Sequence, residues 1–116
     1  MPAYREEKLK SVLMAYAAEF IAREASQRSI ITVTDVELSE DLSQATIRCT
    51  IFPVEHEERA LEFLRRQRSD LYHFVNAKMK SKRIPLFDFA IDEGEKSRQQ
   101  LDKAFLADKL RREEND

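Results

Sequence analysis

Apolar residues recur every three or four positions over residues 3–27, which predicts a long amphipathic helix at the start of the chain. Alanines placed between these positions raise the helix propensity of the segment further. The polar residues from Ser26 to Ser29 break the pattern and end the predicted helix. The apolar stripe consists of Leu9, Val12, Leu13, Tyr16, Phe20 and Ile21.

The next segment, Ile30–Leu38, is rich in β-branched residues, as β-strands prefer. Its apolar residues have one parity before Thr34 and the opposite parity after Asp35. A β-bulge or a twist at this point would place both sets on the buried face of a sheet. The polar run Ser39–Ser43 has the composition of a turn.

The segment Ser43–Phe52 alternates without a slip, which predicts a second strand with one buried face and one open face. Pro53 ends this strand. Cys49 has the apolar parity, so we interpret it as a small buried core residue. The apolar parity comprises Ala45, Ile47, Cys49 and Ile51, and the open parity comprises Thr46, Arg48, Thr50 and Phe52.

Residues 55–83 form a second helical region with a polar interruption. The run Arg65–Asp70 has no apolar side chain, and the apolar periodicity resumes at Leu71. Ser69 and Asp70 are residue types that often cap the N-terminus of a helix. We therefore predict two short helices that meet at a kink near Ser69, with one continuous helix carrying a polar belt as the alternative.

A third strand and a last helix complete the pattern. Pro85 closes the helical region, and Leu86–Asp92 alternates again as a strand. Gly94, the only glycine, marks a turn before a final helix over Glu95–Arg112, and we expect the tail 111–116 to fray.

The predicted order is α-β-β-α-kink-α-β followed by a C-terminal helix. Three strands with helices packed on one face make a two-layer α+β fold. We expect residues 1–94 to form this domain and residues 95–116 to form a helical extension.

Composition places the chain among single globular domains. It has 116 residues, of which 42% are hydrophobic and 36% are charged, enough for a core under a charged surface. No apolar run approaches the roughly 20 residues that span a bilayer, and the N-terminus has no signal-peptide core. The single cysteine forms no internal disulfide. We expect a soluble, cytoplasmic protein.

The charge is polarised although the net charge is only −2. Residues 59–83 contain eight basic and two acidic residues, so this window carries +6 and the rest of the chain carries −8. A phosphate backbone responds to such a local field rather than to the net charge. A solvated basic helix face without a partner is the alternative interpretation.

Catalytic chemistry finds no support in the residues. One glycine cannot build a phosphate-binding loop, and one cysteine with two histidines gives no metal-ligand spacing. Carboxylate pairs are expected by chance among 22 acidic residues. We therefore predict that the protein is not an enzyme and that it uses no metal and no other cofactor.

Nucleic-acid binding has more support. The open parity of the second strand carries an aromatic residue, Phe52, only at its end, so the sheet is a poor platform for stacking RNA bases. The basic helical region suits phosphate contacts, which carry affinity and little sequence information. The candidate RNA-binding residues are Arg65, Arg66, Arg68, Lys78, Lys80, Lys82 and Arg83, with Arg48 apart from them on the open face of the sheet.

The hairpin sequence "ITVTDVELSEDLSQATIRCTIF" resembles that of the bacterial ribosome-binding factor A family. The similarity covers most of residues 4–105. The matching residues in the hairpin are Thr34, Asp35, Val36, Ser39, Asp41, Leu42, Ser43 and Ala45, and those near the third strand are Ile84, Pro85, Phe89 and Asp92.

The resemblance implies a KH-like fold in which the usual glycine loop is replaced by an Ala-x-Gly kink. The aligned positions here are Gln67, Arg68 and Ser69, so Gln67 stands in place of the alanine and Ser69 in place of the glycine. Serine does not favour a positive φ, so the chemistry of this kink departs from the family pattern.

The resemblance also implies a partner, namely the small ribosomal subunit with its ribosomal RNA, and a role in its late maturation and in growth in the cold. It implies no enzyme activity, no cofactor, no small-molecule substrate and no membrane, and we expect a monomer. Two alternatives stay open: a protein–protein interaction module of the same fold, and a general structured-RNA-binding domain.

Overall fold

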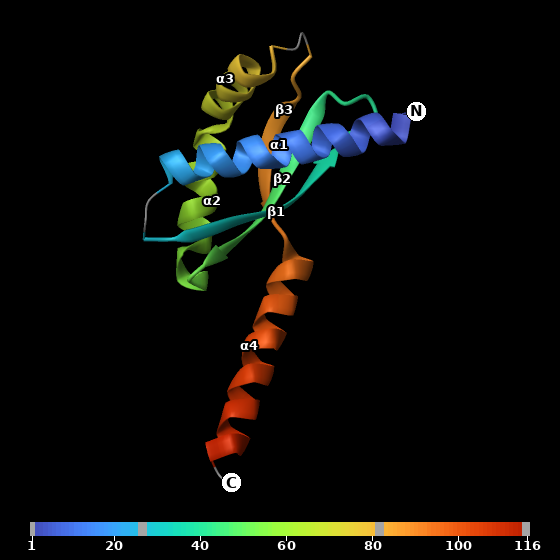
Figure 1. Cartoon of the computed structure of the whole chain (residues 1–116). Coiled ribbons are helices and arrows are strands. Elements are labelled where there is room, and N and C mark those ends of the chain that lie inside the picture. Colours follow the sequence, from blue (N-terminus) through green and yellow to red (C-terminus); the bar gives the residue numbers. More distant parts are fainter. Residues whose placement is uncertain (1, 26–27, 81–82, 115–116) are drawn as a thin grey trace.

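The computed structural model describes residues 2–25, 28–80 and 83–114, and it has the predicted element order (Figure 1). Three strands and four α-helices follow one another as α-β-β-α-α-β-α. The elements are α1 (Pro2–Glu24), β1 (Ile30–Leu38), β2 (Gln44–Phe52), the 3-10 turn η1 (Val54–His56), α2 (Glu57–Arg66), α3 (Arg68–Met79), β3 (Leu86–Ile91) and α4 (Glu93–Glu114).

The strands form one mixed sheet in the order β1-β2-β3. β1 and β2 are antiparallel, whereas β2 and β3 are parallel and are joined by a crossover through α2 and α3. The register shifts between Val33 and Asp35, which confirms the predicted bulge. Because of this shift, Val36 is fully buried while Ile31, Val33 and Leu38 also pack against the core.

The β1–β2 turn is held by Asp41, whose carboxylate accepts hydrogen bonds from the hydroxyls of Ser39 at 2.8 Å and Ser43 at 2.7 Å. These bonds lower the pKa of Asp41, since they stabilise its charged form. Leu42, between them, has φ 60° in the left-handed region. The turn chemistry predicted for Ser39–Ser43 is therefore confirmed.

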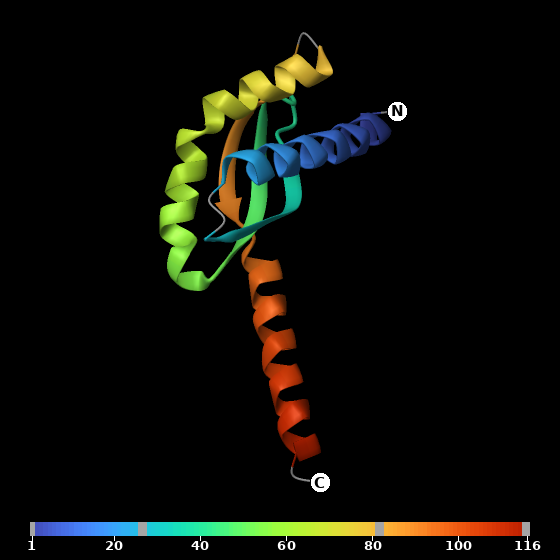
Figure 2. The ribbon, with the colours of Figure 1, turned by 60° about the vertical axis from the view of Figure 1, so that its left-hand side comes forward.

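Helices α1, α2 and α3 cover one face of the sheet, as predicted (Figures 1 and 2). The core lies between this layer and the inward parity of the strands. Phe20 of α1 and Phe74 of α3 meet at 5.6 Å between ring centroids. Each fully buried large apolar side chain stabilises the fold by about 1.5–3 kcal/mol. The largest of them include Leu13, Val36, Ile47, Leu64, Leu71, Val75 and Phe89.

Helices α2 and α3 are separate, as predicted, and the break lies at Gln67, one of the three predicted kink positions and two residues before Ser69. Gln67 has φ −92° and ψ 6°, and its N–H donates to the carbonyl of Leu64 at 2.9 Å, which tightens the last turn of α2. Among the residues that the structure describes, no side chain caps the start of α3. The prediction that Ser69 or Asp70 caps this helix is therefore wrong, since α3 has already begun at Arg68.

This break needs no glycine. Among the described non-glycine residues, only Leu42 and Lys80 have a positive φ, so Ser69 has ordinary backbone geometry. The Arg68 guanidinium supports the break, because its Nε donates to the carbonyl of Arg65 at 2.9 Å. A side chain thus satisfies a carbonyl at the C-terminus of α2, where carbonyls lack helical partners.

The helical region ends at Met79, four residues before the predicted end at residue 83. Lys80 takes the left-handed conformation, with φ 54° and ψ 26°, and its N–H donates to the carbonyl of Asn76 at 3.0 Å. This geometry turns the chain out of the helix. Pro85 is buried just before β3, so it does not end the helix as predicted.

Helix α4 extends away from the other elements in both views (Figures 1 and 2). It begins at Glu93, two residues before the predicted start, and the helix continues through the part of the tail expected to fray, as far as Glu114. Its side chains from residue 97 to residue 112 are exposed. Within the described part of the chain, no helix is long and apolar enough to cross a membrane.

The first turns of α4 contact the rest of the protein through polar groups. Lys96 pairs with Glu57 of α2 at 3.0 Å, and Gln99 donates to the hydroxyl of Thr50 at 3.4 Å. Thr50 is consequently only 6% exposed, so the prediction of an open position is wrong for this residue. Phe52 is 55% exposed, with the ammonium of Lys103 lying 5.3 Å from its ring centroid.

Candidate nucleic-acid interface

Two candidate arginines on either side of the break between α2 and α3 contact the same residue of β3. Arg65 lies 3.6 Å and Arg68 3.5 Å from the same carboxylate oxygen of Asp88. Arg65 also donates to the carbonyl of Phe89 at 3.2 Å, which satisfies a backbone group of this edge strand. We call Arg65, Arg68 and Asp88 the kink clamp.

The kink clamp keeps a positive character. Two guanidiniums share one carboxylate, and the side chains of Arg65 and Arg68 are 48% and 50% exposed. Surface ion pairs of this kind contribute only about 0–1 kcal/mol each. Each arginine carries five N–H donors, so the clamp still presents donors to a phosphate.

The C-terminal end of α3 carries further candidate cations. Lys80, just after α3, and Arg83, before β3, are both exposed. Lys82 lies outside the described residues. We call the region formed by Arg65, Arg68, Lys80 and Arg83 the α3 surface. The twelve residues of α3 separate its two ends by about 18 Å, at 1.5 Å per residue.

Lys78 has a structural partner instead. Its ammonium lies 3.5 Å from the carboxylate of Glu19 and 5.4 Å from the ring centroid of Phe74. The guanidinium of Arg23 lies over the same ring at 5.6 Å. Lys78 therefore belongs to the contact between α1 and α3, although its side chain is 42% exposed.

Arg66 lies away from the kink clamp, although its neighbour Arg65 is part of it. It lines a cavity of about 500 Å³ between the end of α1, the start of β1 and α2. Among the residues that the structure describes, its guanidinium has no ion pair or hydrogen bond. Arg59 lines the same cavity.

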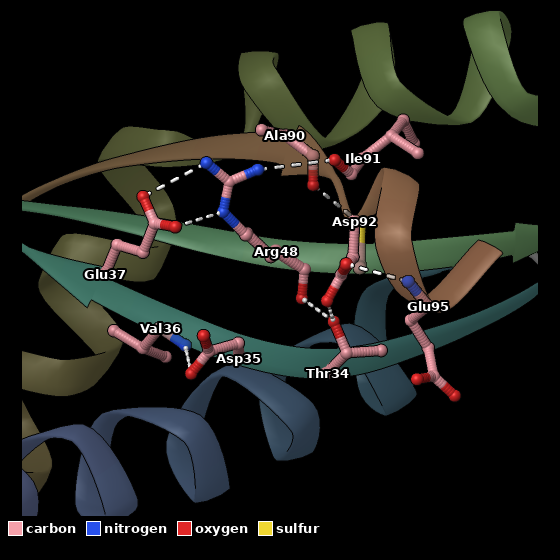
Figure 3. A network of polar contacts seen from close by, with 10 residues as sticks. Thr34, Asp35, Val36, Glu37, Arg48, Ala90, Ile91, Asp92 and Glu95 are labelled. Carbon is pink, nitrogen blue, oxygen red and sulfur yellow. Dashed lines mark hydrogen bonds and ion pairs between the residues drawn. The ribbon is translucent and has the colours of Figure 1, made fainter. Parts of the chain in front are cut away.

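Arg48 lies apart from the other candidates, on the sheet face opposite the three helices, and it is paired (Figure 3). Its guanidinium donates to both carboxylate oxygens of Glu37, at 2.7 Å and 3.0 Å. This bidentate contact raises the pKa of Arg48 and lowers the pKa of Glu37. A third contact, at 3.5 Å, reaches the carbonyl of Ile91, so Arg48 links all three strands.

Asp92 connects this network to α4 (Figure 3). Its Oδ2 accepts a hydrogen bond of 2.6 Å from the hydroxyl of Thr34, which is located at the bulge of β1. Its Oδ1 accepts a bond of 3.0 Å from the N–H of Glu95, in the first turn of α4. The Thr34 hydroxyl is the largest cause of the lowered pKa of Asp92. One carboxylate thus caps α4 and joins it to β1.

Sequence reasoning missed Asp88 and Arg59. Nothing local marks Asp88 as more than one carboxylate among many, because its contact with the two arginines depends on the parallel pairing of β3 with β2. The position of Arg59 could have been found from the sequence. It stands four residues before Phe63 and seven before Arg66, and residues at these spacings lie on one face of a helix.

Other titratable groups suggest no chemistry. Cys49 is fully buried, and this burial raises the pKa of its thiol to about 11, which keeps it protonated and unreactive. In the described ranges, no group of three or more His, Cys, Asp or Glu side chains is placed to hold a metal ion. His73 is exposed on α3, and His56 contacts the hydroxyl of Ser29 at 2.9 Å.

Fold and surface define the class as a small α+β protein with a glycine-free helix break and arginines along an edge strand. The profile of the family described as "Ribosome-binding factor A" matches residues 5–105, which is most of the chain. The chain belongs to the ribosome-binding factor A family.

Individual relatives agree with this assignment. Ribosome-binding factor A of Thermodesulfovibrio yellowstonii is 31% identical over 114 residues, which cover 97% of this chain and 92% of that protein. The crystal structure of ribosome-binding factor A from Thermus thermophilus has a TM-score of 0.66 and 28% identity, over 73% of this chain and 93% of that one.

A second Thermus thermophilus structure is a homology model of the same factor, fitted into a cryo-EM map of its complex with the 30S subunit. It has a TM-score of 0.60 and 29% identity, over 74% of this chain and 89% of that one. The predicted family and fold class are thus confirmed.

Proposed function

We propose that this protein binds the small ribosomal subunit through its ribosomal RNA and assists late maturation of that subunit, with a role in growth in the cold. Membership of the ribosome-binding factor A family carries the proposal. The Thermus thermophilus factor in complex with the 30S subunit supports the choice of partner. The protein then acts as a binding factor without enzyme activity, in the cytoplasm where these subunits are found.

We place the RNA contact on the α3 surface. Arg65 and Arg68 contact Asp88 and the Phe89 carbonyl of β3, so their side chains are partly ordered before RNA arrives, which lowers the entropy lost on binding. Lys80 and Arg83 extend the surface beyond α3, and Lys82 belongs to the same proposal from sequence. Arg48 lies on the opposite face of the sheet, and Lys78 belongs to the contact between α1 and α3, so both contribute less. Residues 1–94 form the binding domain in this proposal, and residues 95–116 form its extension.

The first experiment is co-sedimentation of the purified protein with small ribosomal subunits over a series of salt concentrations, with large subunits as the control. We expect selective pelleting with small subunits that weakens as salt rises, because phosphate contacts release counterions. A folded protein that pellets with neither subunit would refute the proposal and favour the protein–protein interaction module.

A charge variant tests the surface. The double substitution Lys80→Gln with Arg83→Gln should lower the slope of log affinity against log salt by about 1.4, at about 0.7 per phosphate contact. The matched control is Arg5→Gln with Lys8→Gln, which removes the same charge from exposed positions near the N-terminal end of α1. Equal slopes for the two variants would remove the α3 surface from the proposal.

A further inference from the structure

The cavity beside Arg66 is a separate feature from the kink clamp. Its walls come from the end of α1, the first residues of β1, η1 and α2. Its volume of about 500 Å³ falls within the range of small-ligand sites, roughly 300–1,000 Å³.

The lining combines apolar and cationic groups. Ile31, Ala60 and Phe63 contribute apolar surface and one aromatic ring. Three arginines against a single glutamate, Glu24, give the lining a positive charge. Arg28 belongs to this set.

Arg59 and Arg66 distinguish this cavity from the rest of the basic region. The arginines of the kink clamp already share a carboxylate, and Arg48 already pairs with Glu37. The guanidiniums of Arg59 and Arg66 have no such partner within the described ranges. Unpaired arginines beside an apolar wall match a ligand that is flat and apolar at one end and anionic at the other.

We propose that this cavity receives one unpaired nucleotide of the bound RNA. Its base would lie against Phe63 and the neighbouring apolar wall, and its phosphates would contact Arg59 and Arg66. Aromatic rings hold unstacked bases in this way without strong sequence preference. The proposal deepens the proposed function, because it rests on RNA binding and adds a nucleotide subsite distinct from the α3 surface.

Arg66 makes the link between the two surfaces. It follows Arg65 directly in α2, and consecutive helical residues project about 100° apart. One side chain therefore reaches the kink clamp while the next lines the cavity. An RNA strand that crosses the break at Gln67 would contact both surfaces.

The test is an NMR titration of the isotopically labelled full chain with single-stranded hexauridylate, with hexaglutamate as a second probe of similar charge. Saturating shifts of the amides of Ile31, Ala60 and Phe63 with hexauridylate alone would support the site. Equal shifts with hexaglutamate would overturn it in favour of a general anion site or an acidic protein segment.

Three variants localise the effect. Phe63→Leu keeps apolar packing but removes the ring, and it should weaken hexauridylate binding about tenfold, whereas Phe63→Tyr should retain binding. Arg59→Gln with Arg66→Gln removes both unpaired guanidiniums and should weaken binding to a similar extent. The Arg5→Gln with Lys8→Gln control should leave it unchanged. Unaltered affinity in both Phe63→Leu and the double arginine variant would overturn the proposal.

Co-sedimentation separates this inference from the proposed function. If the wild-type protein pellets with small subunits while hexauridylate leaves the cavity amides unshifted, the subsite is wrong and the proposed function stands. If hexauridylate saturates the cavity but the protein does not pellet with small subunits, the subsite stands and the proposed function is wrong.

Discussion

Asp92 is the residue whose replacement tests the polar network most sharply. Asp92→Ala removes two contacts at once, the 2.6 Å bond from the Thr34 hydroxyl and the 3.0 Å bond from the Glu95 N–H. Losing a helix N-cap costs about 1 kcal/mol. The hydroxyl bond adds about 1 kcal/mol, less than the roughly 1.5–3 kcal/mol typical of a charged acceptor, because Thr34 keeps the carbonyl of Arg48 as a second acceptor at 3.3 Å.

We therefore expect Asp92→Ala to lower the free energy of unfolding by about 2 kcal/mol at pH 7, measured by urea denaturation with far-ultraviolet circular dichroism. Thr34→Val should cost about half of this, because it leaves the cap intact while keeping a β-branched residue in β1. In a double-mutant cycle, the two sites should couple by about 1 kcal/mol. Amide exchange at Glu95 and Lys96 should accelerate in Asp92→Ala, because the first turn of α4 loses its cap.

The pH dependence of this effect has a definite sign. The pKa of Asp92 is lowered in the folded protein, so its ionised form is stabilised there and the unfolded chain binds more protons in the acid range. Its contribution is complete above the ordinary value of 3.8 and disappears as the pH falls through the lowered folded pKa. The stability difference between wild type and Asp92→Ala should therefore shrink at low pH. A variant within about 0.3 kcal/mol of wild type at pH 7, or an effect that stays constant with pH, would refute the reasoning.

Two further predictions concern single residues. The pKa of Cys49 is raised to about 11, so the unfolded state loses its thiol proton first and stability falls as pH rises from about 9 to 11, by up to about 2–3 kcal/mol. Thermal melts over this range should show that slope reduced in Cys49→Ala, and equal slopes would contradict the buried-thiol account. Lys80→Gly should raise the free energy of unfolding by about 0.5–1 kcal/mol, because glycine takes the left-handed conformation without the steric cost that lysine incurs. The same variant should weaken binding to small subunits if Lys80 contacts phosphate, and a destabilised Lys80→Gly protein would argue against the left-handed turn.

The strands were predictable because their signals are local. The alternation of apolar residues along Ile30–Leu38 is enough to locate the bulge. When the apolar positions change parity within one strand, a bulge is one of the few ways to keep all of them on the buried face. The break lies at Gln67, two residues before Ser69 but within the predicted kink positions 67–69, and it does not depend on a capping side chain. It is supported by the side chain of Arg68, whose hydrogen bond to the carbonyl of Arg65 leaves no pattern in hydrophobic periodicity.

The candidate site was less predictable because it depends on contacts across the fold. Charge alone could not show that Arg48 pairs with Glu37, which lies diagonally across from it, two residues beyond its register partner Asp35. Nor could it separate Arg65 from Arg66, neighbours in sequence that serve different surfaces. The cavity itself joins residues 24–25 and 28–31 to residues 56–66, and no local pattern reveals such a junction.

The glycine-free break has a mechanical consequence. A glycine at this junction would make the angle between α2 and α3 soft, because glycine samples many backbone conformations. Here the angle is set by a chain of contacts from the Arg65 carbonyl through Arg68 to Asp88 on β3. The angle between α2 and α3 is therefore constrained by a contact with the sheet as well as by the helices themselves. Salt that screens the Arg68–Asp88 pair would loosen this constraint. Ionic strength would then change the flexibility of the α2–α3 junction along with the proposed attraction to RNA.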